Sequence, residues 1–275
     1  ARGDPFVLFE LAQALQYLKD DGAAYRAMRA SADRGYPRAQ AMLGVFYESG
    51  RIVSIDKVEA TRLYRLSALQ GDPFGEYYLG NAYERGMGVT TDMSEALKWY
   101  RRAADHGLPA AQDALGIAYA FGRGVPKNIG EAVRWFKRGA EGGLAQSMNS
   151  YGYALTRGDG VEKNVPEGLS WLRRAADVGQ ANAMHTLAGS YLSGQGVPVD
   201  LVESYVWASL AQKAYESGFD QTDIAKGRLK QVTQLRLSLE QRLSPQQRTQ
   251  AERRVATFVP KQSTVLVPPP APPKS

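Results

Sequence analysis

The side chains best suited to acid–base or metal chemistry in this chain are two histidines and a series of evenly spaced glutamates. The histidines are His106 and His185. The glutamates recur every 36 residues, as Glu59, Glu95, Glu131, Glu167 and Glu203. Paired carboxylates can act as general acid and base, and histidines can bind metals. The spacing places these glutamates in different repeats, and His106 falls at an expected helix end, where the helix dipole favours a cation. We therefore predict no catalytic residue and no metal site.

Other routes to catalysis are also missing from the sequence. The chain contains no cysteine, which excludes disulfides, thiolate metal ligands and thiol nucleophiles. The glycine pair Gly86 and Gly88 lacks the lysine of a phosphate-binding loop. We therefore predict a protein that is not an enzyme and that needs no cofactor. A remote alternative is an enzyme that acts on cell-wall material.

The glutamates belong to a pattern that repeats every 36 residues and that must position any functional side chain. Glycine stands at 44, 80, 116 and 152 and again at 50, 86, 122, 158 and 194. Leu63 is followed at the same spacing by tryptophan at 99, 135, 171 and 207. Fixed periods of 20 to 50 residues are typical of repeat architectures. The pattern predicts a tandem array of helix pairs.

Each repeat contains the signals that start and stop two helices. In the first helix, a small residue such as Gly80 lets a neighbouring helix approach, and Gly86 ends the helix. The second helix begins at an Asp or Asn such as Asp92, followed three residues later by Glu95. This spacing predicts a capping box, in which both side chains bind free backbone amides of the first turn. A second glycine series, which includes Gly107, ends these helices.

These residues also match a known family. The segment Leu79-Gly80-x-x-Tyr83-x-x-Gly86-x-Gly88-Val89, followed by Ala96-x-x-Trp99-Tyr100-x-x-Ala103-Ala104-x-x-Gly107, closely resembles the Sel1-like repeat, a relative of the tetratricopeptide repeat. The resemblance extends from residue 39 to about residue 215. It implies an all-α, right-handed α/α solenoid that binds other proteins.

The resemblance and the helix signals together predict four segments. Residues 4–38 form a tetratricopeptide-like capping hairpin, 39–219 five Sel1-like repeats, 220–258 the C-terminal capping helices, and 259–275 a proline-rich tail that is either disordered or docked on a partner. Ile52 replaces a loop glycine of the other repeats, so the first loop is expected to follow a different path. Tyr215 replaces a closing glycine, so the last second helix is expected to continue further.

Specificity for a partner can be encoded where the repeats differ from one another on a constant framework. Three such positions lie on one face of the first helices, here called the first-helix face, and we predict that it forms a concave binding surface. The alternative is neutral variation of an ordinary surface. The predicted binding residues are Tyr77, Asn81, Glu84, Asp113, Ile117, Asn149, Tyr153 and His185.

Two weaker candidate surfaces remain. The formal net charge is +6, and a column of cations repeats on the second helices, at Arg65, Arg101, Lys137 and Arg173. This basic outer face is either solvated or bound to an acidic partner or lipid headgroups. In the tail, a short segment is a candidate docking peptide. Its residues are Val265, Leu266, Val267, Pro268 and Pro269.

The resulting functional hypothesis is an adaptor or scaffold that binds partner proteins. We expect no nucleic acid as partner, because such binding would need the cations gathered on one face. Proteins with the resembling repeat include envelope-assembly factors, secreted virulence proteins and periplasmic regulators of sensor kinases. We therefore expect a larger bacterial envelope complex as partner, with membrane contact only through a membrane protein. The alternative is a periplasmic regulator that inhibits a sensor protein. The chain begins without methionine, which fits a removed signal peptide and a shortened chain equally well. The family resemblance leads us to expect export, and a cytoplasmic location stays open.

Overall fold

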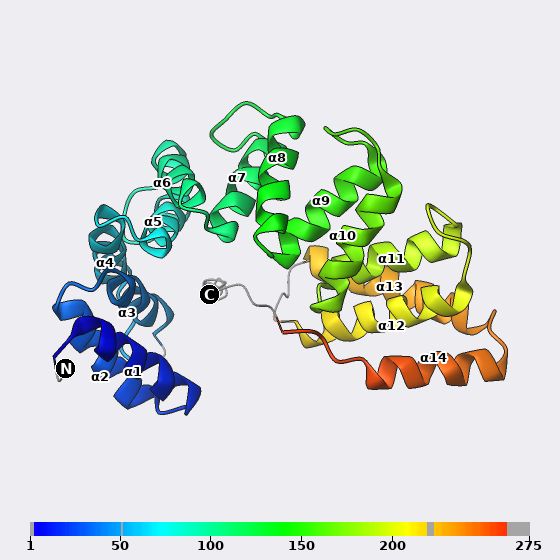
Figure 1. Ribbon diagram of the computed structural model, residues 1–275, viewed down its shortest axis with the longest axis horizontal. Coiled ribbons are helices and arrows are strands. Elements are labelled where there is room, and N and C mark those ends of the chain that lie inside the picture. Colours follow the sequence, from blue (N-terminus) through cyan, green and yellow to red (C-terminus); the bar gives the residue numbers. More distant parts are fainter. Residues whose placement is uncertain (1–2, 51, 219–222, 263–275) are drawn as a thin grey trace. The chain divides into compact units, whose positions relative to one another are not determined.

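The protein is an all-α repeat solenoid, as the sequence predicts (Figure 1). A computed structural model describes residues 3–50, 52–218 and 223–262, and these residues form helices without any strand. The helices are α1 (Pro5–Tyr17), α2 (Asp21–Asp33), α3 (Pro37–Ser49), α4 (Lys57–Leu69), α5 (Pro73–Arg85), α6 (Met93–Asp105), α7 (Pro109–Phe121), α8 (Ile129–Glu141), α9 (Ala145–Arg157), α10 (Val165–Asp177), α11 (Ala181–Ser193), α12 (Leu201–Ser217), α13 (Asp223–Glu240) and α14 (Pro245–Thr257).

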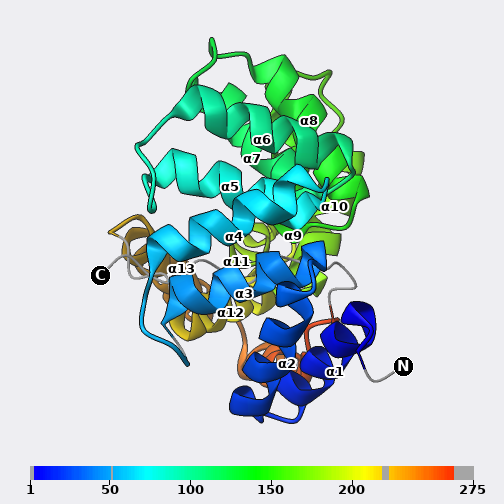
Figure 2. The same cartoon turned by 90° about the vertical axis from the view of Figure 1, so that its left-hand side faces the viewer.

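The described helices form two compact units, α1 to α7 in residues 3–127 and α8 to α14 in residues 128–262. Within the first unit each helix packs on the next, and Figure 2 shows α3, α4 and α5 side by side. Within the second unit α12 packs against α11, α13 and α14. The two helices that follow the last repeat therefore cover α12, as end units of repeat arrays must cover an open apolar face.

The glycines inside the first helices allow close helix packing, as predicted. A Cβ atom at Gly80 of α5 would lie 2.7 Å from the ring of Tyr100 and 3.2 Å from the Ala96 carbonyl oxygen, both on α6. Tyr100 is almost completely buried at this contact. The missing side chain at Gly80 thus creates the space for a buried tyrosine of the second helix.

The predicted capping boxes are only half formed. The Asp or Asn side chain accepts a hydrogen bond from the third residue of the helix, as in Asp92 Oδ1 with the Glu95 amide at 3.0 Å. The glutamate does not complete the box, because the Asp92 amide already donates to the Tyr83 carbonyl oxygen at 3.0 Å. Glu95 instead pairs with Lys98 at 2.6 Å. Glu59, Glu131 and Glu203 also pair with arginines, whereas Glu167 accepts hydrogen bonds from the side chains of Asn164 and Trp171. The described residues contain a complete box at Ser244 of α14.

The two departures from the repeat pattern have the expected consequences. Gly88, Gly124 and Gly160 adopt left-handed backbone angles, whereas Ile52 at the equivalent position does not. Ile52 packs instead against the hydrophobic core of α1 to α4. Helix α12, which lacks the closing glycine at Tyr215, is 17 residues long, whereas the second helices α4 to α10 have 13 each.

Candidate partner-binding surface

In the first unit, several predicted binding residues come together around a buried tyrosine. The Tyr100 hydroxyl of α6 donates a hydrogen bond to Glu84 Oε2 at 2.6 Å and lies 3.0 Å from Asn81 Oδ1, both on α5. The Tyr77 ring lies 5.8 Å from the Tyr100 ring. Burial of Tyr77, and to a smaller extent the charge of Asp113, raise the pKa of Tyr77. Asp113 lies on α7 and is itself buried. These side chains mainly hold α5, α6 and α7 together.

The Tyr100–Glu84 pair explains why one column of the first-helix face varies. The preceding repeat has the same pair, Tyr64 with Glu48 at 2.6 Å. The third repeat has Phe136 and Ala120 at the two positions, so it lacks the hydroxyl group and the carboxylate together. The column that contains Glu84 therefore changes with the tyrosine column of the second helix. A comparison of the two columns in the sequence would have revealed this structural pairing.

Alkaline pH is expected to destabilise the first unit through these tyrosines. Burial, and then the charges of Glu48 and Glu84, raise the pKa values of Tyr64 and Tyr100 well above the usual value. Because the folded state disfavours the phenolate, stability is complete below about pH 10 and falls as the pH rises further. Thermal unfolding midpoints measured from about pH 8 to pH 11 should show this decline, and Tyr100→Phe should reduce its slope. Midpoints that stay constant above pH 10 would contradict this reading.

In the second unit, the predicted residues are more accessible to a partner. Tyr153 of α9 has 44% of its surface exposed. One helical turn earlier, Asn149 has a buried amide oxygen with no hydrogen-bond partner. The guanidinium group of Arg157 lies 5.5 Å from the Tyr153 ring. This part of the first-helix face combines an exposed aromatic ring, a cation and an unpaired acceptor.

The remaining predicted residues of the first-helix face are half-buried. Ile117 lies on α7 in the first unit. His185 of α11, in the second unit, lies edge-on to the Tyr215 ring with the ring centres 6.5 Å apart. Burial, with a smaller effect of the Arg228 charge, lowers the pKa of His185. The neutral form of His185 is therefore favoured, which makes it part of the packing between α11 and α12.

The basic outer face has a structural role that the sequence analysis missed. Arg65 donates a hydrogen bond to the Tyr83 hydroxyl at 3.2 Å, Arg101 to Tyr119 at 2.9 Å, and Arg173 to Tyr191 at 2.8 Å. Each of these arginine–tyrosine pairs joins a second helix to the first helix of the following repeat.

Lys137 is the exception in the basic column. The residue 18 positions later is Leu155 rather than tyrosine, and Lys137 lies 3.9 Å from Glu141 instead. Lysine thus replaces arginine where the tyrosine is missing. This joint change is the signal in the sequence from which the pairs could have been inferred.

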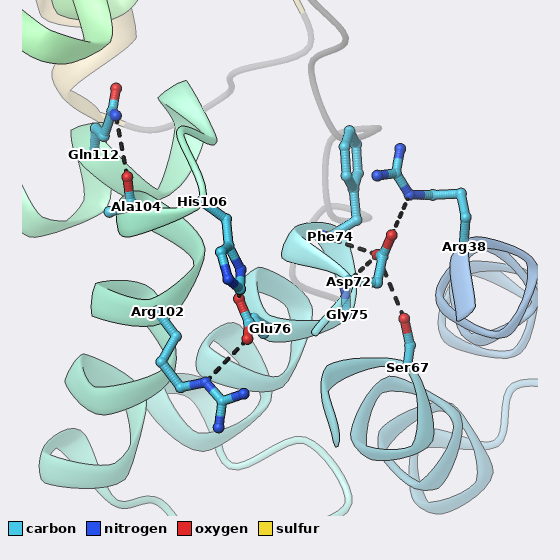
Figure 3. A network of polar contacts seen from close by, with 10 residues as sticks. All are labelled: Arg38, Ser67, Asp72, Phe74, Gly75, Glu76, Arg102, Ala104, His106 and Gln112. Atoms are coloured by element: carbon cyan, nitrogen blue, oxygen red, sulfur yellow. Dashed lines mark hydrogen bonds and ion pairs between the residues drawn. The ribbon is translucent and has the colours of Figure 1, made fainter. Parts of the chain in front are cut away.

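A second polar network surrounds a fully buried carboxylate at the start of α5 (Figure 3). Glu76 Oε1 accepts a hydrogen bond from Arg102 Nε at 3.0 Å, and Glu76 Oε2 lies 2.9 Å from His106 Nδ1. Arg102 lies on α6 and His106 directly follows it, and both side chains are about half exposed. In the same view, Asp72 pairs with Arg38 of α3 at 2.7 Å. His106 therefore has a structural role in the contact between α5 and α6.

The described residues contain no constellation that suggests a reaction. No group of three or more metal-binding side chains in this part of the chain could hold a metal ion. None of its helices is long and apolar enough to cross a membrane. The predicted docking segment at 265–269 lies outside the described residues.

Comparison with known proteins identifies the repeats. A family model for the Sel1 repeat matches residues 37–72, 73–108, 109–144, 145–180 and 181–218. No curated protein matches the chain. The matched ranges confirm the predicted resemblance, with five repeats in register.

Solved structures agree with the family match. The chain is similar to a Sel1 repeat protein from Oxalobacter formigenes, with 34% identity and a TM-score of 0.72 over 78% of this chain and 89% of the other. It is also similar to a protective antigen present in uropathogenic Escherichia coli strains, with 28% identity and a TM-score of 0.77 over 97% of this chain. The chain spans only 58% of that antigen's length. An immunity protein from Pseudomonas aeruginosa shares the fold at 17% identity and a TM-score of 0.53.

Proposed function

The chain belongs to the Sel1 repeat family, and we propose that it is an adaptor that binds a partner protein through the first-helix face of its second unit. The observation that carries this proposal is the arrangement on α9, where the partly exposed Tyr153 ring lies beside the guanidinium group of Arg157. Tyrosine and arginine are enriched among residues that dominate protein interfaces. Arg157, beside the Tyr153 ring, adds the second of these residue types.

The proposal places the binding site on fewer residues than the sequence suggested. Tyr77, Asn81 and Glu84 already contact Tyr100, so a partner would have to compete with contacts inside the protein. Tyr153 is 44% exposed, and the contact described above for its ring is with the side chain of Arg157 one turn later. We therefore regard the second unit as the main binding site.

The proposed setting is an envelope complex of a bacterium, with the protein exported to the periplasm. The resemblance of the repeats to those of envelope-assembly factors supports this setting. Similarity to a protective antigen of Escherichia coli is consistent with an exported protein. The identity of the protein captured in the crosslinking experiment below would distinguish an envelope complex from a sensor protein that this chain inhibits.

Site-specific crosslinking in cells tests the proposed surface. A photoreactive amino acid at position 153 of the full chain is expected to crosslink to one partner protein. The same residue at position 134, on the exposed outer side of α8 in the same unit, serves as the matched control. Equal crosslinking at both positions, or none at 153, would argue against the first-helix face as the binding site.

Binding measurements with the identified partner then test the role of the tyrosine. Tyr153→Ala is expected to weaken binding at least tenfold, which corresponds to about 1.4 kcal/mol. Because more than half of the Tyr153 surface is buried, the substitution should also lower the free energy of unfolding by about 1 kcal/mol, which leaves the variant folded. Unchanged affinity in a folded variant would exclude Tyr153 as a major contact.

A further inference from the structure

The outer surface of α4 carries apolar side chains that nothing in the described structure covers. Val58, Leu66 and Leu69 expose 67%, 38% and 65% of their surfaces. With a turn of about 100° per residue, the three side chains point within about 80° of one another. The opposite side of α4 carries the buried residues Ala60, Tyr64 and Ser67. We call Val58, Leu66 and Leu69, with the neighbouring Arg62 and Arg65, the α4 stripe.

The other repeats show that the fold does not require apolar residues at these positions. The equivalent residues are Ser94, Arg102 and Asp105 in α6, Gly130, Arg138 and Glu141 in α8, and Pro166, Arg174 and Asp177 in α10. Arginine is not needed at position 66, because the residue equivalent to Glu76 in that repeat is the neutral Gln40. This accounts for the missing charge, but not for three exposed apolar side chains on one face of a helix. Apolar patches of this kind mark interaction surfaces.

Cations border the apolar residues. Arg62 lies between Val58 and Leu66 on the helix surface and is bound by Glu59 at 2.7 Å. Arg65 donates a hydrogen bond to the hydroxyl group of Tyr83. This acceptor is neutral, so the bond does not compensate the positive charge of the guanidinium group. Helix α4 as a whole carries three cations and one carboxylate. Its exposed side therefore attracts negative charge.

We propose that the α4 stripe binds an amphipathic helix of a partner protein, with aliphatic residues on one face and Asp or Glu at the border of that face. The apolar residues follow the α4 axis from Val58 to Leu69, about 16 Å, which matches about three turns of a second helix. Helices commonly bind such surfaces through residues spaced by three, four and seven positions. The carboxylates of the partner would lie beside Arg62 and Arg65. This surface lies on a different helix from the proposed site around Tyr153 and does not depend on it.

A stapled helical peptide of about 14 residues, with leucines along one face and glutamates at its border, is a suitable probe. Its binding to the full chain is measured by fluorescence anisotropy and compared with binding to the V58S/L66R/L69D variant. That variant gives α4 the residues that α6 has at the same positions and leaves the net charge unchanged. We expect it to bind at least tenfold more weakly, while its thermal unfolding shows that it remains folded. Asp105→Asn on α6 is the matched control and should bind like the natural chain.

Two further measurements test the chemistry of the partner. A peptide with lysine in place of glutamate should bind the natural chain at least tenfold more weakly, because it faces Arg62 and Arg65. Vesicles that contain phosphatidylglycerol should bind equally to the natural chain and the variant, or not at all. The proposal is overturned by equal peptide affinity of chain and variant, by equal affinity for the lysine peptide, or by no binding at about 1 mM peptide. Stripe-dependent binding to vesicles would instead assign the surface to a membrane.

Crosslinking at position 153 separates this proposal from the proposed function. The V58S/L66R/L69D variant should retain the crosslink at 153, because Tyr153 lies on α9 in the other unit. Loss of peptide binding with the crosslink preserved supports two separate surfaces. Loss of the crosslink in the folded variant would contradict their independence.

Discussion

Replacing Arg102 with leucine is expected to lower the free energy of unfolding by about 3 kcal/mol. The substitution removes the guanidinium group beside the fully buried carboxylate of Glu76 and leaves the contact with the His106 ring. Removing one partner of a buried ion pair typically costs about 3–5 kcal/mol, because a buried charge loses its compensation. Chemical denaturation of the full chain, followed by circular dichroism, measures the loss.

The preceding repeat supplies the control for this prediction. Its equivalent residues are Gln40, Leu66 and Gln70, and Gln70 donates a side-chain hydrogen bond to Gln40 at 2.8 Å. The E76Q/R102L/H106Q variant should therefore recover most of the stability that Arg102→Leu loses. It would still lack the contact of Arg102 with the Trp99 ring, worth about 0.5–1 kcal/mol. A triple variant no more stable than Arg102→Leu would show that the buried charge is not the cause.

A single methyl group at Gly88 is expected to destabilise the first unit by about 3 kcal/mol. Gly88 has a φ of 65°, which costs alanine about 1–2 kcal/mol. Its Cβ would also collide with the Lys57 carbonyl oxygen and lie 2.8 Å from the Val58 Cα. These are backbone atoms, so a side-chain rotation cannot relieve the collision. Such overpacking costs about 1–3 kcal/mol more.

Gly22→Ala is the matched control for Gly88→Ala in the same unit. Gly22 lies in the first turn of α2, and the nearest atom to a new Cβ is Arg26 Nη1 at 3.6 Å, an ordinary contact distance. We expect its unfolding midpoint in denaturant to stay constant or rise slightly, because alanine favours the helix. Similar losses for both substitutions would indicate that the loop around Gly88 is not specifically strained.

The sequence predicted the features that depend on local structure. The helix starts at Asp56 and Asp92 and the stops at Gly50 and Gly86 follow from backbone groups within a few residues. Period and family resemblance then place the helices in a repeat solenoid. These elements could be predicted because each depends on one column of the repeat.

The functions of individual polar residues could not be predicted in this way. Glu84 varies between repeats like a binding residue, yet it accepts a hydrogen bond from Tyr100, 16 residues later. Arg65 resembles a solvated surface cation, yet it binds Tyr83, 18 residues later. Such pairs join two columns, so neither column shows the contact when it is considered alone. The α4 stripe likewise depends on knowing which side of α4 is buried.

The hydrogen bonds within and between repeats have a consequence for the order in which the protein folds during its synthesis. The loop bond from the Asp92 amide to Tyr83 and the bond from Arg65 to Tyr83 join residues only 9 and 18 positions apart. They can form soon after the ribosome has released each repeat. The C-terminal contacts, Arg254 with Glu203 and Lys261 with Asp177, span 51 and 84 residues. The helices α10 and α12 therefore gain these partners only after the segment that contains Arg254 and Lys261 has been synthesised.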